Sequence, residues 1–220
     1  RSPLLASSAA SDVYKRQVLD LACGTGSVSK YLSDLGYNVI GLDLSDEMLT
    51  VASSKQIKNA MFIKGDMTNF ELPHKVDCCV CSLDSINHLK DIVEVKKCFD
   101  CVYNSLNDGG VFVFDVNTVY KHKNVLGNNT FVFDEEDFFL SWDNEYLGDN
   151  TVRILLDFFV YNGKNYDRFS EEFNEKAYSV NELKSVLNNF NIIGIYDELN
   201  LDDIKDDSER IYLVFRERGK

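Results

Sequence analysis

Hydrophobic and polar positions in the first half of the chain alternate between two periods. Short apolar runs predict buried strands at Val18–Ala22, Asn38–Leu44, Met61–Lys64, Val76–Leu83 and Val111–Val116. Apolar residues at helical spacing predict intervening helices at Val28–Leu35, after the capping residue Ser45, and near Asp91–Leu106. Because strands separated by helices pair in parallel through right-handed crossovers, we expect a doubly wound α/β sheet with helices on both faces.

The second half carries a different pattern, in which aromatic residues alternate with polar ones. Strands are predicted at Thr130–Phe133, Phe138–Trp142, Val152–Val160 and Tyr166–Ala177, with Asn162-Gly163 as a hairpin turn between the last two. A helix at Ser179–Phe190 and closing strands at Ile192–Tyr196 and Arg210–Phe215 follow. Residues 117–178 are therefore predicted to form a small antiparallel β insertion, laid over the sheet.

The first residues of the chain do not share this organisation. Arg1–Gln17 is rich in serine and alanine, has no sustained period, and abuts a strong strand without a turn. We interpret it as a non-native or disordered leader that resembles a translated vector or sequence-assembly remnant. The alternative is a native N-terminus or a short native helix. Since 220 residues support one sizeable core, residues 18–220 are predicted to form a single domain.

Composition narrows the class of partner. The formal net charge of −13, without any run of Lys or Arg, argues against nucleic acid. No apolar run approaches the roughly 20 residues that span a bilayer, so no membrane partner is expected. The six cysteines occur without a secretory signal pattern, which favours free thiols in a reducing cytoplasm.

Four of the cysteines have spacings that also occur in metal sites. Cys98-Phe-Asp-Cys101 would need a second pair, for which Cys79-Val-Cys81 is the candidate. Strand alternation places Cys79 and Cys81 on one face of a strand, whereas Cys98 and Cys101 share a face of a helix. Buried thiols are the simpler interpretation, so no metal site is predicted and zinc is the alternative.

A glycine-rich turn, Asp20-Leu-Ala-Cys-Gly24-Thr-Gly26, follows the first strand and opens a helix. In an open α/β sheet, ligands bind in the crevice at this end of the strands. Asp43 ends the second strand and is placed to accept hydrogen bonds from both hydroxyls of a ribose. The alternative is a tight turn with a surface aspartate. Two ligands fit, a dinucleotide and S-adenosylmethionine (SAM); Ser29 stands where the dinucleotide fingerprint has its third glycine, a mild departure.

The wider motif succession favours SAM. Val18–Gly26 resembles motif I of the class I methyltransferases very closely, and Gly41–Met48 and Gly65-Asp66-Met67 resemble the motifs that follow it. The chain therefore resembles the class I (Rossmann-like) SAM-dependent methyltransferases of the bacterial small-molecule type, from about Val18 to Phe215. This resemblance implies a seven-stranded sheet with an antiparallel last strand.

The resemblance also implies the site residues. Gly24 and Gly26 would line the methionine part of SAM, while Asp20 would buttress the loop or reach the amino group through water. Asp43 would hold the ribose, and Asp66 would accept from the adenine amino group. The full cofactor-binding set that we expect is Asp20, Ala22, Cys23, Gly24, Thr25, Gly26, Asp43, Leu44, Met48, Gly65, Asp66, Met67 and Leu83.

Methyl transfer needs little from the protein beyond geometry, because the sulfonium is already activated. A base is needed only where the acceptor must lose a proton, and Asp84 and His88 are the catalytic candidates near the mouth of the sheet. His88 is equally compatible with a solvent-facing position at a helix start. The predicted function is transfer of the SAM methyl group to a small molecule. The alternatives are a non-catalytic SAM-binding regulator and an NAD-binding oxidoreductase.

Asn117–Tyr178 is expected to cover the methyl-transfer end of the cofactor as a lid. It combines many aromatic side chains with many carboxylates. That mixture suits an amine or another cation. In the alternative interpretation, the aromatic residues pack the small sheet and the acidic residues face water.

Overall fold

A computed structural model of the chain describes residues 16–198 and 203–219. The predicted leader lies outside these residues up to position 15, while Gln17 already belongs to the first strand. None of the described helices combines the length and the apolar composition that crossing a bilayer requires.

The larger of two sheets has seven strands in the order β10-β11-β5-β4-β1-β2-β3. Their bounds are β1 Gln17–Leu21, β2 Asn38–Asp43, β3 Ala60–Lys64, β4 Val76–Cys81, β5 Leu106–Asn117, β10 Phe190–Asp197 and β11 Arg210–Glu217. Strand β11 is antiparallel to both of its neighbours, and the other pairs are parallel. The predicted fold class is therefore confirmed, including the reversed last strand.

Alternation along the strands decides which helix covers which face. In β4, the alternate residues Cys79 and Cys81 are buried in one cluster with Phe99 on helix α3 (Ile92–Ser105). Phe99 also packs its ring on Phe112 and Phe114 of β5, 5.4 and 5.1 Å between centroids.

The two helices that follow β1 and β2 are α1 (Ser27–Asp34) and α2 (Asp46–Ser54). The Ser45 side chain caps α2 by accepting from the Met48 backbone, as predicted.

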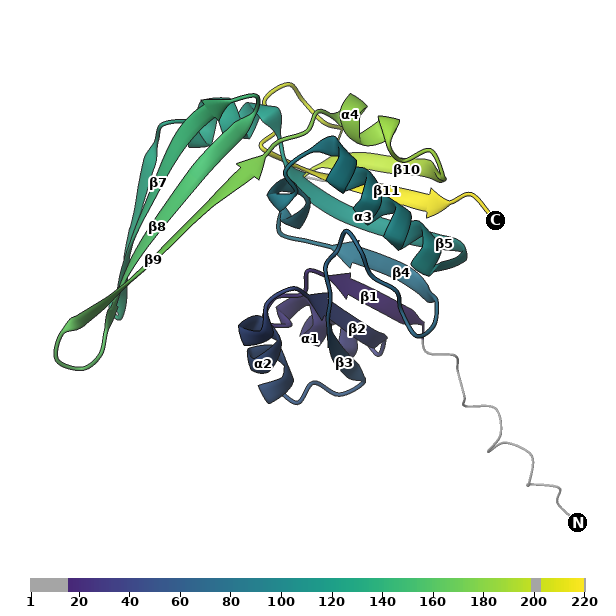
Figure 1. Cartoon of the computed structure of the whole chain (residues 1–220), viewed down its shortest axis with the longest axis horizontal. Helices are drawn as coiled ribbons and strands as arrows, with labels where there is room; N and C mark the ends of the chain where they lie inside the picture. The colour runs from purple at the N-terminus through teal and green to yellow at the C-terminus, as the bar shows by residue number, and fades with distance from the viewer. Residues whose placement is uncertain (1–15, 199–202, 220) are drawn as a thin grey trace, which may run out of the picture.

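The insertion forms a separate four-stranded antiparallel sheet, which we call the arm. Its strands, in the order β6-β7-β8-β9, are β6 Thr130–Asp134, β7 Phe138–Gly148, β8 Thr151–Tyr161 and β9 Tyr166–Lys176. The arm projects from the end of the large sheet (Figure 1), so the prediction that it is laid over that sheet is wrong. Strands β7, β8 and β9 have 11 residues each, which corresponds to a length of about 35 Å. They are longer than β1 to β4, which have 5 to 6 residues each.

Four local elements differ from the sequence prediction. The helix predicted at Ser179–Phe190 is α4, Val180–Ser185, and stops before two consecutive asparagines, which favour turns over helix. Strand β5 begins at Leu106 rather than at the predicted Val111, and its pairing with β4 is irregular before Val111. A 3-10 helix, η1 (Ser85–His88), and a π-helix, η2 (Lys121–Leu126), were not predicted because neither has an amphipathic period.

Candidate functional site

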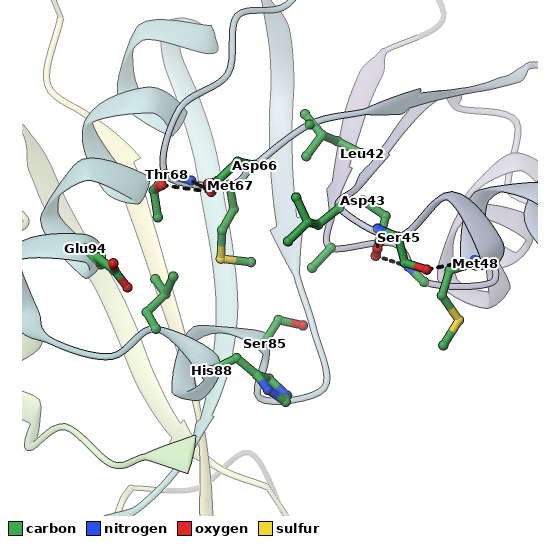
Figure 2. Close-up of a pocket in the computed structure, with 15 residues that line it drawn as sticks. Leu42, Asp43, Ser45, Met48, Asp66, Met67, Thr68, Ser85, His88 and Glu94 are labelled. Atoms are coloured by element: carbon green, nitrogen blue, oxygen red, sulfur yellow. Dashed lines mark hydrogen bonds between the residues drawn. The ribbon is translucent and has the colours of Figure 1, made fainter. Parts of the chain in front are cut away.

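A cavity of about 570 Å³ opens where β1, β2, β3 and β4 end, and Figure 2 shows the side chains around it. This volume lies within the range of small-ligand sites. Of the predicted residues, those that line it are Ala22, Gly24, Asp43, Leu44, Met48, Gly65, Asp66, Met67 and His88. The predicted residues outside its lining are Asp20, Cys23, Thr25, Gly26, Leu83 and Asp84.

The two glycines of the turn have different surroundings. Both adopt left-handed backbone angles, with φ of +53° at Gly24 and +77° at Gly26. A Cβ on Gly24 would meet nothing within 4 Å, so this position leaves open space beside the cavity. A Cβ on Gly26 would lie 3.0 Å from the Phe62 ring and 3.2 Å from Ala52. Gly24 therefore admits a ligand, whereas Gly26 lets helix α1 pack closely on its neighbours.

Asp43 ties the glycine turn to the end of β2. Its Oδ2 accepts from the Gly24 backbone N–H at 2.8 Å, and its Oδ1 accepts from the Ser45 backbone N–H at 2.9 Å. In Figure 2, Asp43, Ser45 and Met48 stand together on one side of the cavity. Since each carboxylate oxygen has a further lone pair, Asp43 can accept from a ligand while keeping the turn in place.

The opposite wall follows β3. The Asp66 Oδ1 accepts from both the backbone N–H and the hydroxyl of Thr68 at 2.8 Å, which closes a tight turn. The next residue, Met67, points its side chain into the cavity between Asp66 and His88 (Figure 2). Leu44 and Met48 across the cavity are strongly exposed. Exposed apolar side chains around a polar-edged hollow are typical of a binding site.

Asp20 lies beneath the turn and is completely buried. Its Oδ2 accepts from the Ser29 hydroxyl at 2.5 Å. Burial raises the pKa of Asp20 to about 6, although the Ser29 hydrogen bonds oppose that shift. At neutral pH the ligand-free protein therefore carries a buried negative charge at an energetic cost.

Replacing that carboxylate should stabilise the ligand-free protein. Because the folded-state pKa is raised, the stabilising contribution of protonated Asp20 is present at low pH and is lost as the pH rises through about 6. We expect Asp20→Asn to increase the free energy of unfolding by about 2 kcal/mol at neutral pH, and by little near pH 4. Urea titrations at both pH values measure this. The control is Asp100→Asn, at a surface ion pair with Lys96; equal effects of the two variants would contradict the prediction.

Leu83 and Asp84, at the end of β4, both have left-handed backbone angles, with φ of +59° and +51°. Their N–H groups converge on the Asp115 carboxylate at 2.8 and 2.9 Å. Arg210 of β11 donates to Asp115 at 2.8 Å and to Asp84 at 3.1 Å. Burial and the nearby Glu175 raise the pKa of Asp84, against the opposing effect of Arg210. This arrangement fixes the loop at the mouth of the cavity and engages the Asp84 carboxylate in an ion pair.

His88 forms the wall next to this loop, in contact with the arm. Its Nε2 lies 3.7 Å from Oε1 of Glu175 on β9, and its ring lies 5.3 Å from that of Phe173. The other Glu175 oxygen faces Nε2 of the buried His122 at 3.7 Å and the amide of Asn117 at 3.4 Å. Burial would raise the pKa of Glu175, but His122, His88 and Asn117 outweigh it and hold the pKa below its usual value. His88 therefore has a charged carboxylate behind it.

The surroundings of the cysteines indicate a structural role. Cys79, Cys81 and Cys98 are completely buried, and burial raises the pKa of each thiol. In residues 16–198 and 203–219, no three His, Cys, Asp or Glu side chains gather as a metal site would need. The zinc alternative has no support in this part of the chain.

Sequence reasoning missed several residues of the site. The unpredicted residues that line the cavity are Leu42, Ser45, Thr68, Ser85, Leu89 and Glu94. Ser45 lies inside the motif Gly41–Met48, and Thr68 directly follows the motif Gly65-Asp66-Met67, so taking every residue of each motif and the one after it would have found both. The brace between Asn87 and Asn117 had no local signal. Asn87 Oδ1 accepts from the Asn117 N–H at 2.9 Å, and its amide donates to the carbonyls of Asn117 and Lys176.

Comparisons with known proteins agree with this geometry. A family model described as a methyltransferase domain matches residues 18–110. YqeM of Bacillus subtilis strain 168, named as a candidate methyltransferase, is 36% identical over 182 residues, which cover 80% of this chain and 72% of that protein.

A solved structure extends the similarity to the arm. The crystal structure of a SAM-dependent methyltransferase from Clostridium acetobutylicum ATCC 824 matches with a TM-score of 0.86 at 36% identity, over 92% of this chain and 84% of that chain. A dTDP-3-amino-3,4,6-trideoxy-α-D-glucopyranose N,N-dimethyltransferase of Streptomyces venezuelae is 34% identical over 98 residues, which cover 44% of this chain and 41% of that enzyme.

Proposed function

The chain belongs to the class I SAM-dependent methyltransferase family, and from that premise we propose that it moves the methyl group of SAM to a small-molecule acceptor by in-line displacement. Its cofactor is SAM and its activity is methyl transfer. This family membership replaces the alternatives of an NAD-binding oxidoreductase and of a SAM-binding regulator without activity.

The single observation that carries the proposal is the cavity at the ends of β1 to β4. Gly24 leaves open space on one side, where a Cβ would meet nothing within 4 Å. Asp43, with lone pairs to spare, would hold the ribose hydroxyls, and Asp66 would accept from the adenine amino group. Leu44 and Met48 would cover the adenine with apolar surface. The residues present thus fit SAM in shape and in polarity.

The chemistry that SAM supplies when bound is a methyl group on an activated sulfonium. In the proposed step, an acceptor lone pair forms a bond to the methyl carbon, in line with the carbon–sulfur bond that breaks. The electron pair of the broken bond stays on sulfur. An acceptor that loses a proton in this step needs a base. We assign that role to His88, because it lines the cavity and has Glu175 behind it.

Asp84 is the weaker candidate for the base. Its carboxylate pairs with Arg210 and accepts from Asn117, and it lies outside the lining of the cavity. We assign Asp84 and Leu83 to positioning the loop that borders the methyl-transfer region. The arm, with its base against His88, would cover the acceptor end of the site.

A small acceptor agrees with the acidic charge of the chain, which disfavours nucleic acid. It also agrees with the substrate after which the Streptomyces venezuelae relative is named, a nucleotide-linked amino sugar.

The test is to incubate the protein with methyl-labelled SAM and three fractions of a bacterial extract: dialysable molecules, protein and nucleic acid. We expect label in the dialysable fraction. His88→Gln should slow that transfer by about 100-fold or more and leave SAM affinity unchanged, because a general base contributes about that much. The control is His74→Gln, which changes a histidine in a separate hollow. Label confined to protein or nucleic acid would refute the small acceptor, and an active His88→Gln would refute the base.

A further inference from the structure

One face of the arm continues outward from the wall of the cavity. We call it the inner face; it consists of alternate residues of β9, from Asp167 to Glu175, with their cross-strand partners on β6, β7 and β8. Near the large sheet this face is covered. Phe173 and Glu175 meet His88 there, and Leu126 of η2 packs on Val152 and Ile154 of β8.

Farther out, the inner face is apolar and open. One cross-strand row runs through all four strands and consists of Phe133, Leu140, Phe158 and Phe169. Phe133 is 43% exposed and Phe169 is 57% exposed. Phe169 lies four positions before Phe173 along β9, so the row lies about 14 Å from the contact with His88. Apolar side chains that are exposed as a continuous row mark a binding surface more often than a solvated one.

The two arginines of the arm strands share one face, whereas acidic residues occur on both faces. Arg153 and Arg168 lie on the opposite face, where each is paired with an acidic side chain. The inner face of β9 carries Asp167, Glu171 and Glu175, and Glu171 forms no ion pair with any described residue. The sequence analysis left open whether the acidic residues and the aromatic residues of the insertion would lie on opposite faces. On β9, acidic and aromatic residues share one face. This face therefore presents apolar surface beside the Glu171 carboxylate, which no cation of the described residues balances.

We infer that the inner face binds the body of the methyl acceptor, and that the acceptor is an amine with an apolar or aromatic body. This inference rests on the proposed function of the site. The acidic edge complements an ammonium ion, and the rings of Phe169 and Phe173 complement both a cation and an apolar group. The face also runs without a break into His88, beside which the nitrogen would react.

The transfer step balances for such an acceptor. The ammonium form first gives its proton to His88, which leaves a lone pair on nitrogen. That lone pair forms the nitrogen–carbon bond while the carbon–sulfur bond of SAM breaks, and the electron pair of the broken bond stays on sulfur. The methylated amine carries the positive charge that the sulfonium loses.

The chain offers its own probe for this face. Trp142, its single tryptophan, lies on the inner face in the same cross-strand row as Glu171. We would saturate the full chain with S-adenosylhomocysteine and follow tryptophan fluorescence during titrations with 2-phenylethylamine, 2-phenylethanol, 3-phenylpropanoate and methylamine. The expected order is 2-phenylethylamine first, bound about tenfold more tightly than the alcohol, with the carboxylate and methylamine far weaker.

Two variants and a matched control locate the effect. Glu171→Gln should abolish the preference for amine over alcohol, and Phe169→Ala should weaken both ligands about fivefold. Phe169 is exposed, so its removal leaves the fold intact. The control is Glu172→Gln, which alters the neighbouring carboxylate on the opposite face, where it lies near Arg153. It should leave every titration unchanged.

The outcomes separate this inference from the proposed function. Failure of S-adenosylhomocysteine to bind would refute the proposed function itself. Normal S-adenosylhomocysteine binding without discrimination between the amine and the carboxylate would overturn the amine acceptor alone. A change from dimer to monomer in Phe169→Ala, without any amine preference in the parent chain, would show that the face joins two copies and would also overturn it.

Discussion

Replacing Asp43 with alanine should weaken SAM binding by roughly 1–3 kcal/mol, or about 5- to 150-fold. The variant loses the proposed acceptor for the ribose hydroxyls. It also leaves the backbone N–H groups of Gly24 and Ser45 without the carboxylate that they now share. Calorimetric titration with SAM and with S-adenosylhomocysteine measures both dissociation constants.

The matched control is Asp34→Ala. Asp34 is an exposed aspartate at the end of α1, paired with Lys30 one turn away, and such pairs contribute only a few tenths of a kcal/mol. SAM affinity should be unchanged in this variant. Asp43→Asn adds a second comparison, because it keeps an oxygen for one N–H but removes the charge. An unaltered dissociation constant in Asp43→Ala would remove this residue from the site.

Replacing Arg210 with alanine should reduce the free energy of unfolding by about 3 kcal/mol at neutral pH. Arg210 is mostly buried and pairs with three carboxylates, those of Asp84, Asp115 and Glu198, of which Asp84 and Asp115 are themselves mostly buried. Without it, both negative charges stay in a poorly solvated place. The loop at Leu83 donates backbone hydrogen bonds to Asp115, and the variant loses the cation that balances the charge of this carboxylate.

The pH dependence of this loss has a definite sign. Burial raises the folded-state pKa of Asp84, so the stabilising contribution of its protonated form is present at low pH and is lost as the pH rises through that pKa. Removing Arg210 should therefore cost most at neutral pH and less near pH 4. Urea titrations at the two pH values measure the difference, with Arg216→Ala, an exposed arginine on the same strand, as control. Equal losses in the two arginine variants would contradict the assignment.

The parts of the molecule that were predicted correctly are those with local signals. The turn at Gly24 and the carboxylate of Asp43 each end a strand, and parallel pairing of β1 with β2 brings those ends together without further information. The hairpin at Asn162-Gly163 and the cap at Ser45 likewise depend on neighbours in the chain.

The parts that were not predicted depend on distant partners. The role proposed for His88 depends on Glu175 of β9, which is far from it in the sequence. The hydrogen bonds of Asn87 likewise depend on the distant residues Asn117 and Lys176. The alternation of residues along β9 predicted which of its side chains share a face of the sheet. It did not predict the direction of that face relative to the large sheet. At the base of the arm, the Asn87 amide donates to the carbonyl of Lys176 at the end of β9, and from there the strands extend away from the large sheet (Figure 1).

The ion pair of Arg210 with Asp84 also bears on how the protein is made. Its two partners are 126 positions apart in the chain, and β11 fills a place between β5 and β10 that stays open until then. During synthesis, the glycine turn and Asp43 have emerged long before the loop at Leu83 receives its anchor. A nascent chain without β11 would thus contain the residues proposed to bind the nucleoside, but the loop proposed to border the methyl-transfer region would still lack Arg210. Such long-range closure is slow compared with local pairing. We therefore expect the folding chain to acquire affinity for SAM before it can transfer the methyl group.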